Sequence, residues 1–274
     1  MNVVRPIVVV VVGGVVATLV FIVCVTWYGK WTDSRSATYS GISDGACNIA
    51  IVPIRGEIVA YDGELADSSS TTSGDWFTGY VRAAENDLNI QGILVPIDST
   101  GGEPAPSEQM MNVLKRSKLP TAALIREDGD SGAYLAASGA NTIIAADVGY
   151  VGSIGITYSY LDNTEANKQA GLKFISLASG PFKDSGNPNK PLTDADRALY
   201  QRDIKIFKDV FVQYVAQNRN LATTTVDAIA DGSVMPAILA LQHGLIDQIG
   251  DEETARTWFA LKLGIDPSDV RFCE

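Results

Sequence analysis

The chain has 274 residues, of which 46% are hydrophobic and 19% are charged, and its formal net charge at pH 7 is −11. An acidic chain repels phosphate backbones, so we expect no nucleic-acid partner. It has one histidine, His243, and three cysteines without a CxxC pair. This composition argues against a histidine-based metal cluster or a zinc site, and we expect neither a metal nor another cofactor.

An apolar segment without charges, residues 6–29, lies between Arg5 and Lys30. As a helix with a rise of about 1.5 Å per residue, it would reach roughly 36 Å and cross a hydrocarbon core of about 30 Å. A cleavable signal peptide has a shorter apolar region followed by small residues, whereas bulky side chains end this one. We therefore predict an uncleaved transmembrane anchor over residues 1–30 and a polar tether over residues 31–46.

From residue 47 onward, strand and helix patterns alternate, and we predict one domain over residues 47–274. Regular alternation of this kind is typical of an α/β domain. Thr193, followed by two aspartates, is a suitable N-terminal cap for the longest helix. The predicted strands cover 48–58, 92–98, 120–125, 141–145 and 172–177; the predicted helices cover 76–88, 107–115, 132–137, 161–170 and 193–218, and a surface loop covers 61–75.

Two short motifs at strand exits contain glycine. Gly101 and Gly102 follow one strand, and adjacent glycines let the backbone turn its N–H groups toward a cavity, as an oxyanion hole requires. Such a pair taken alone is more often a simple turn. Ser131 stands between a strand and a helix of small residues, a layout that resembles a nucleophile elbow. On this motif alone, a helix-capping serine is the safer interpretation, and the nucleophile remains the alternative.

A serine nucleophile needs a base at neutral pH. His243 lies beside a predicted helix end, where a lone histidine is usually a surface or capping residue. A lysine serves as the base where burial lowers the lysine pKa. Lys183 lies in a loop after a predicted strand, and nothing in its local sequence distinguishes it from a solvated lysine.

The cysteines lie in two different parts of the chain. Cys24 falls in the apolar segment, whereas Cys47 and Cys273 stand near the two ends of the predicted domain. A disulfide between Cys47 and Cys273 is compatible with an oxidising compartment outside the cytosol, and two unpaired thiols fit the sequence as well.

Read together, six motifs over about residues 47–263 resemble the signal peptide peptidase A (SppA) family of bacterial and archaeal membrane proteases. Each motif taken alone is modest, and their fixed order makes the resemblance specific. The motifs are Ile49–Ile58, Ile97–Gly102, Ser131–Tyr134, Val151–Gly155, Gly180–Asp184 and Ala240–Asp247 followed by Gly250.

The resemblance implies a Clp-protease/crotonase-like α/β domain that uses a Ser–Lys dyad. Ser131 takes the position of the nucleophile and Lys183 that of the general base. Ser153 takes the position that hydrogen-bonds the lysine amine. The backbone N–H of Gly102, assisted by Gly101 or Gly132, would form the oxyanion hole.

The sequence departs from the family pattern near these residues. Asp130 precedes Ser131 where the family usually has a small residue, and Ala133 replaces a glycine. Thr100 stands where the family typically has proline. A carboxylate close to the lysine would favour its protonated form and weaken it as a base.

The resemblance also implies a function and a setting. We expect a membrane-bound serine endopeptidase that hydrolyses remnant signal peptides or other small apolar peptides, assembles into a homo-oligomer, and is held in the cell membrane by residues 6–29. The family places its catalytic domain on the extracytoplasmic side. The alternatives are a catalytically impaired membrane scaffold of the same fold and a crotonase-type acyl-CoA enzyme; the latter lacks a basic site for the CoA phosphates and explains neither Lys183 nor the anchor.

Overall fold

The computed structural model describes residues 42–61 and 71–273, so the predicted anchor over residues 1–30 lies outside the described residues. Among the residues that are described, no helix is both long enough and apolar enough to cross a membrane. Residues 42–46, the last part of the predicted tether, lie against the end of the first described helix. There the Ser43 N–H donates to Asp87 Oδ2 at 2.9 Å.

Nine strands within residues 42–61 and 71–273 form one sheet. Its main path runs β3-β2-β4-β5-β6-β9, β1 also pairs with β4, and β7 joins β5 to β8. Every pairing is parallel except that between β7 and β8. The strands are β1 (Ile49–Ile51), β2 (Ile54–Val59), β3 (Thr71–Ser73), β4 (Gly92–Gly102), β5 (Thr121–Asp130), β6 (Thr142–Ala145), β7 (Tyr150–Gly152), β8 (Val234–Pro236) and β9 (Gln248–Ile249).

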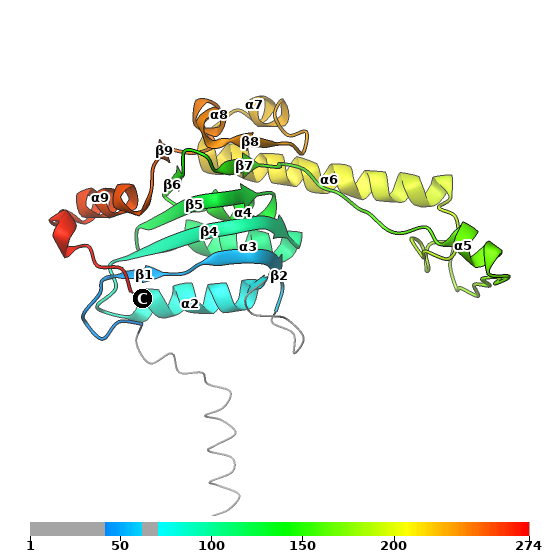
Figure 1. The fold of residues 1–274 in the computed structure, drawn as a ribbon, viewed down its shortest axis with the longest axis horizontal. Helices are drawn as coiled ribbons and strands as arrows, with labels where there is room; N and C mark the ends of the chain where they lie inside the picture. The colour runs from blue at the N-terminus through cyan, green and yellow to red at the C-terminus, as the bar shows by residue number, and fades with distance from the viewer. Residues whose placement is uncertain (1–41, 62–70, 274) are drawn as a thin grey trace, which may run out of the picture. The chain divides into compact units, whose positions relative to one another are not determined.

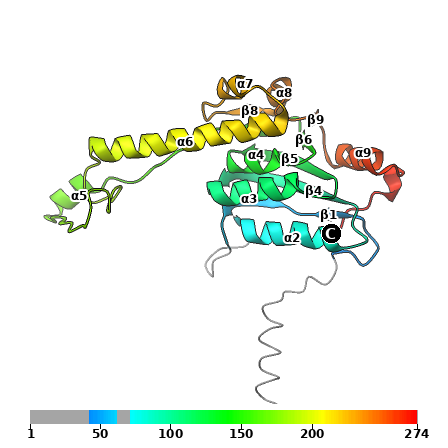
Figure 2. The same cartoon turned by 180° about the vertical axis from the view of Figure 1, so that it is seen from behind.

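Helices cover both faces of this sheet, which confirms the predicted α/β class (Figures 1 and 2). Helices α2, α3 and α4 pack on one face around the larger apolar core, and α9 packs on the other face around a smaller one. The helices are α2 (Gly74–Asn86), α3 (Pro104–Lys115), α4 (Gly132–Ala137), α5 (Thr164–Gln169), α6 (Asp194–Arg219), α7 (Thr223–Asp227), α8 (Ala237–Gln242) and α9 (Glu252–Leu263), followed by a 3-10 turn (Pro267–Asp269).

The first predicted strand, residues 48–58, is divided into β1 and β2 in the structure. Both pieces pair with β4, but Pro53 lies between them. Proline has no N–H to donate to a ladder, so the hydrogen bonding of the strand is interrupted there.

The prediction of a strand over residues 172–177 is wrong. This stretch lies in a long excursion between β7 and α6 that we call the arm, residues 157–193, and it pairs with no strand of the described residues. Its apolar side chains stay in solvent, with Ile175 72% and Leu177 96% exposed. An apolar run gives the same pattern whether it lies in a sheet or on an unpartnered surface.

The arm follows α6 beyond the edge of the sheet, and Figure 1 shows α5, within the arm, at the far end of α6. The predicted cap of α6 is confirmed, because the Thr193 side chain accepts from the Asp196 N–H while the Asp196 carboxylate accepts from the Thr193 N–H. The rings of Tyr158 and Tyr200 stack with their centroids 4.3 Å apart and tie the arm to α6.

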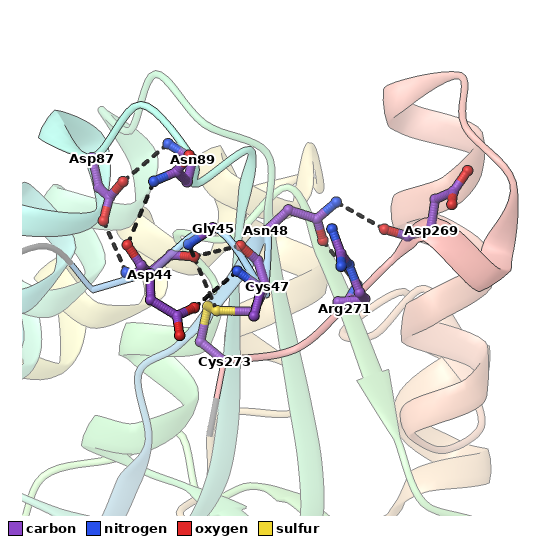
Figure 3. Close-up of a disulfide and its surroundings, with 11 residues drawn as sticks. Asp44, Gly45, Cys47, Asn48, Asp87, Asn89, Asp269, Arg271 and Cys273 are labelled. Carbon is purple, nitrogen blue, oxygen red and sulfur yellow. Dashed lines mark hydrogen bonds between the residues drawn. A yellow bond between two sulfur atoms is a disulfide. The ribbon is translucent and has the colours of Figure 1, made fainter.

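Cys47 and Cys273 form a disulfide, which decides between the two alternatives that the sequence left open (Figure 3). Beside it, the Asn48 side chain donates to the Asp269 carbonyl and accepts from the Arg271 N–H, each at 2.8 Å. The first and last described segments of the domain are therefore joined both covalently and through hydrogen bonds.

Candidate active site

The relative register of β4 and β5 changes just before their carboxyl ends. Ile97 pairs with Ile125, whereas Ser99, two residues on, pairs with Gly129. The extra residues of β5 bulge outward and are held by Asp98, whose carboxylate accepts from Arg126 Nε and from the Glu127 N–H, both at 3.0 Å. The two extra residues draw the end of β5 back along β4 by two positions, so that Ser131 lies beside Gly101.

Ser131 occupies the junction between β5 and α4 that the sequence predicts. Its backbone has φ 50° and ψ −120°, a conformation that non-glycine residues seldom adopt and that costs of order 1–3 kcal/mol. The Ser131 N–H donates to the Gly152 carbonyl of β7 at 2.7 Å. A side chain at such a strained strand-to-helix turn is held in one place by the backbone on both sides.

Three glycines pack closely around this serine. Gly101 has φ 97°, and a Cβ added to it would lie 2.6 Å from the Gly132 nitrogen and 2.9 Å from Ser131 Cβ. A Cβ added to Gly132 would lie 3.3 Å from the Gly102 nitrogen. The Gly132 N–H belongs to the first turn of α4, where N–H groups have no partner within the helix. The backbone amides of Gly102 and Gly132 thus lie close together beside the Ser131 side chain, as an oxyanion hole requires.

The Gly152 carbonyl accepts a hydrogen bond from the Ser131 N–H, and Ser153 follows Gly152 directly. The structure therefore places the backbones of Ser131 and Ser153 close together. Ser153 also has a positive φ, 49°. Its N–H donates to the Ser233 carbonyl at 2.8 Å, and its hydroxyl donates to the Gly232 carbonyl at 3.2 Å. The predicted role of Ser153, to hold a lysine amine, stays a prediction.

An apolar cavity of about 400 Å³ opens beside Ser131 and Gly132. This volume lies within the range of small-ligand pockets. Its polar edge is formed by Tyr214, whose hydroxyl donates to Glu108 Oε1 at 2.7 Å. Its apolar walls come from three helices: Ala105 of α3, Leu135 of α4, and Phe207, Val210 and Phe211 of α6.

Lys183 is not brought to this site within one chain. It lies in the arm, in a turn where its N–H donates to the Gly180 carbonyl, and its side chain is exposed. In the part of the chain that the structure describes, its ammonium group has no hydrogen bond and no ion pair. The two members of the predicted dyad therefore belong to separate parts of the described structure.

The amino-acid sequence matches a known protein family. The family model described as peptidase family S49 matches residues 113–266, more than half of the chain and a range that includes Ser131, Ser153 and Lys183. The chain belongs to peptidase family S49. The predicted resemblance to the SppA family is confirmed. The predicted enzyme class, a serine protease, is confirmed as well.

Several relatives bear protease names. A protein of Methanocaldococcus jannaschii, named as a predicted protease, is 31% identical over 173 residues, which are 62% of this chain and 56% of the relative. A predicted signal peptide peptidase SppA of Enterococcus faecium is 27% identical over 232 residues, 81% of this chain and 66% of the relative. Protease 4 of Haemophilus influenzae is 29% identical over 74% of this chain and 32% of the relative. This member of family S49 thus spans less than two thirds of the length of each of these relatives.

Sequence reasoning missed two parts of the site. Asp98 was part of a recognised motif, but its role in holding the register became visible only with its two partners on β5. The cavity wall on α6 was also missed. A signal for it was present, since Phe207, Val210 and Phe211 recur at helical spacing on a helix whose mean composition is polar.

Asp130, directly before Ser131, has a buried carboxyl group. Its side chain is 6% exposed, and Oδ1 is shielded from solvent without a hydrogen bond in the described residues. Burial raises the pKa of Asp130 from 3.8 to about 6, and the neighbouring Asp128 carboxylate adds to the rise. The folded chain therefore favours the neutral form of Asp130 more strongly than the unfolded chain does.

We predict that Asp130→Asn stabilises the protein at pH 8 and has little effect at pH 4. A pKa raised in the folded state means that the folded chain binds more protons than the unfolded chain between the two pKa values. Stability is then lost as the pH rises from about 4 to 6, by about 1–3 kcal/mol. Urea unfolding of both proteins at each pH measures the difference, and an equal effect at both pH values would contradict the assignment.

Proposed function

We propose that this chain is a membrane-bound serine endopeptidase in which Ser131 is the nucleophile and Lys183 the general base. The observation that carries the proposal is the position of Ser131 on a strained strand-to-helix turn, beside the amides of Gly102 and Gly132 and at the mouth of an apolar cavity. The proposal includes the Clp-protease/crotonase-like form of the α/β fold. Support for this form comes from the parallel sheet and from glycine amides at the carboxyl ends of its strands.

In the proposed mechanism, neutral Lys183 takes the proton from Ser131 as Oγ attacks the scissile carbonyl. The N–H groups of Gly102 and Gly132, with Gly101 shaping the turn, stabilise the oxyanion. The lysine ammonium then protonates the leaving amine, and water hydrolyses the acyl-enzyme. Ser153 would accept or donate a hydrogen bond to the lysine amine and so align it with Ser131.

The proposal requires a homo-oligomer, in which Lys183 of one copy reaches Ser131 of another. Within one chain the arm follows α6 away from the sheet, and the arm exposes large apolar side chains. Contiguous exposed apolar surface on a folded protein marks an interaction site. The exposed apolar residues on the arm are Tyr158, Leu161, Leu172, Phe174, Ile175, Leu177 and Phe182.

Small apolar peptides, among them remnant signal peptides, are the substrates that we propose. The cavity beside Ser131 would accept an apolar side chain next to the scissile bond. Burial of a side chain of the size of Leu or Phe contributes about 1.5–3 kcal/mol, which is enough to select such peptides over polar ones.

Residues 6–29 would anchor the protein in the cell membrane as a single span, since they carry no charge. We place the catalytic domain on the extracytoplasmic side. The disulfide between Cys47 and Cys273 supports this side, because disulfides form and persist in oxidising compartments and are rare in the cytosol.

We predict that a fluorophosphonate probe labels Ser131 and that the labelling rate increases as the pH rises above neutral, because the proposed mechanism uses a neutral lysine amine. Ser131→Ala should abolish labelling, and Lys183→Ala should reduce the rate roughly 100-fold or more, because a positioned base contributes that much to reactivity. Mass spectrometry of the labelled peptide identifies the site. A folded wild-type protein that stays unlabelled would overturn the protease proposal and favour the membrane scaffold.

A second prediction concerns the cavity. Val210→Trp fills space beside Ser131 and should raise KM at least about tenfold for peptides with a large apolar side chain at the cleavage site, with a smaller effect for alanine there. Ile238→Trp, on the exposed face of α8, is the matched control and should leave KM unchanged for both classes of peptide. Equal KM changes for the two peptide classes would show that this cavity does not select the side chain.

A further inference from the structure

The carboxylate next to Lys183 in the sequence is bound by another lysine. Asp184 Oδ1 lies 2.7 Å from Lys190 Nζ, and the two side chains are only 22% and 24% exposed. Lys190 is the first cause of a lowered pKa at Asp184, followed by the Ser176 hydroxyl. This ion pair is partly buried, so solvent screens it less than an ordinary surface pair.

The turn that contains Lys183 is fastened to the start of α6 through the two residues that follow Asp184. Ser185 Oγ donates to Asp196 Oδ1 at 2.6 Å, and Asp196, 2% exposed, also closes the capping box of α6 with Thr193. Gly186 fits tightly against the helix, since a Cβ added to it would lie 2.6 Å from the Tyr200 hydroxyl. The turn is therefore fixed to α6 although it lies on an exposed arm.

The two lysines of this region differ in what they can do chemically. Asp184 raises the pKa of Lys190, which therefore stays protonated and is unsuited to act as a base. Lys183 has no ion pair within 4.0 Å in the described residues, not even with the adjacent Asp184. Lys190 thus binds Oδ1 of the carboxylate that stands closest to Lys183 along the chain, while Oδ2 is buried without a hydrogen bond in the described residues.

We propose that Lys190 is a positioning residue that binds Asp184, keeps this carboxylate away from Lys183 and fixes the turn from which Lys183 acts. The inference rests on the proposed function, in which Lys183 works as a neutral base. A free carboxylate beside Lys183 would attract a proton to its amine and weaken that base. The titratable groups that act on the pair from α6 are Asp196 and Tyr200.

Removing one charge of the Asp184–Lys190 pair at a time tests the proposal. In Lys190→Gln the unpaired Asp184 leaves a negative charge beside Lys183, whereas in Asp184→Asn the unpaired Lys190 leaves a positive one. Trace acetylation of the full-length protein with acetic anhydride, quantified at Lys183 by mass spectrometry over a pH series, gives the midpoint pH at which the amine becomes reactive. This readout does not depend on proteolysis.

The midpoint should shift upward by about half a pH unit in Lys190→Gln and downward by a similar amount in Asp184→Asn. The double variant should return close to wild type, and Lys190→Arg, which keeps the ion pair, should match it. The rate of fluorophosphonate labelling at Ser131 should shift its pH profile in the same directions. Thermal melting of each variant checks that the fold is retained.

Shifts in the same direction for both single variants, or no shift in either, would overturn the proposed role of Lys190 while leaving the protease proposal intact. A lower labelling rate without a shifted midpoint would show that the pair only stabilises the arm, and would overturn it as well. Failure of Ser131 to react in the wild-type protein, with the midpoints shifted as expected, would instead contradict the protease proposal.

Discussion

The candidate site depends on one feature of the sheet, the change of register between β4 and β5. Parallel strands place their carboxyl ends at the same edge, but which residues meet there is set by the register. Asp98 binds Arg126 and the Glu127 backbone and holds the bulge of β5 outward. Without this bulge, Gly129 rather than Ser131 would lie beside Gly101, and the serine would miss the glycine amides by two residues.

The same edge explains why other groups converge on Ser131. Strand β7 pairs with β5 beyond the bulge, so the Gly152 carbonyl binds the Ser131 N–H and Ser153 follows directly. Helix α6 crosses to this edge and supplies one wall of the cavity. Its other end lies outside the sheet beside α5 of the arm (Figure 1). One helix thus connects the cavity at its carboxyl-terminal half with the turn of the proposed base at its amino-terminal end.

The cap of α6 and the strand-to-helix junction around Ser131 could be predicted from the sequence, because both depend on residues that are neighbours along the chain. Thr193 and Asp196 close a capping box three residues apart, and the junction around Ser131 follows from a β-rich run that meets a helix of small residues. The strand predicted over 172–177 failed because apolar residues signal a need for burial but do not name the surface that buries them. Pro53 stands within the first predicted strand, and it divides this strand into β1 and β2 because proline has no N–H to donate to the ladder.

The remaining features of the site depend on contacts between distant residues. The bulge needs Asp98 to meet residues 28 and 29 positions further along the chain. The burial of Asp130 and the cavity wall from α6 depend on packing that no local pattern encodes. The separation of Ser131 from Lys183 within one chain is of the same kind, since the order of motifs does not fix the distance between them in the fold.

Subunit complementation tests the central claim most directly. Ser131→Ala and Lys183→Ala are each expected to be inactive, and the account predicts that a refolded equimolar mixture cleaves an apolar peptide. At random assembly about a quarter of the sites would pair an intact serine with an intact lysine from a neighbouring copy, giving roughly that fraction of wild-type activity. A mixture that stays inactive, although native mass spectrometry shows mixed oligomers, would contradict the account.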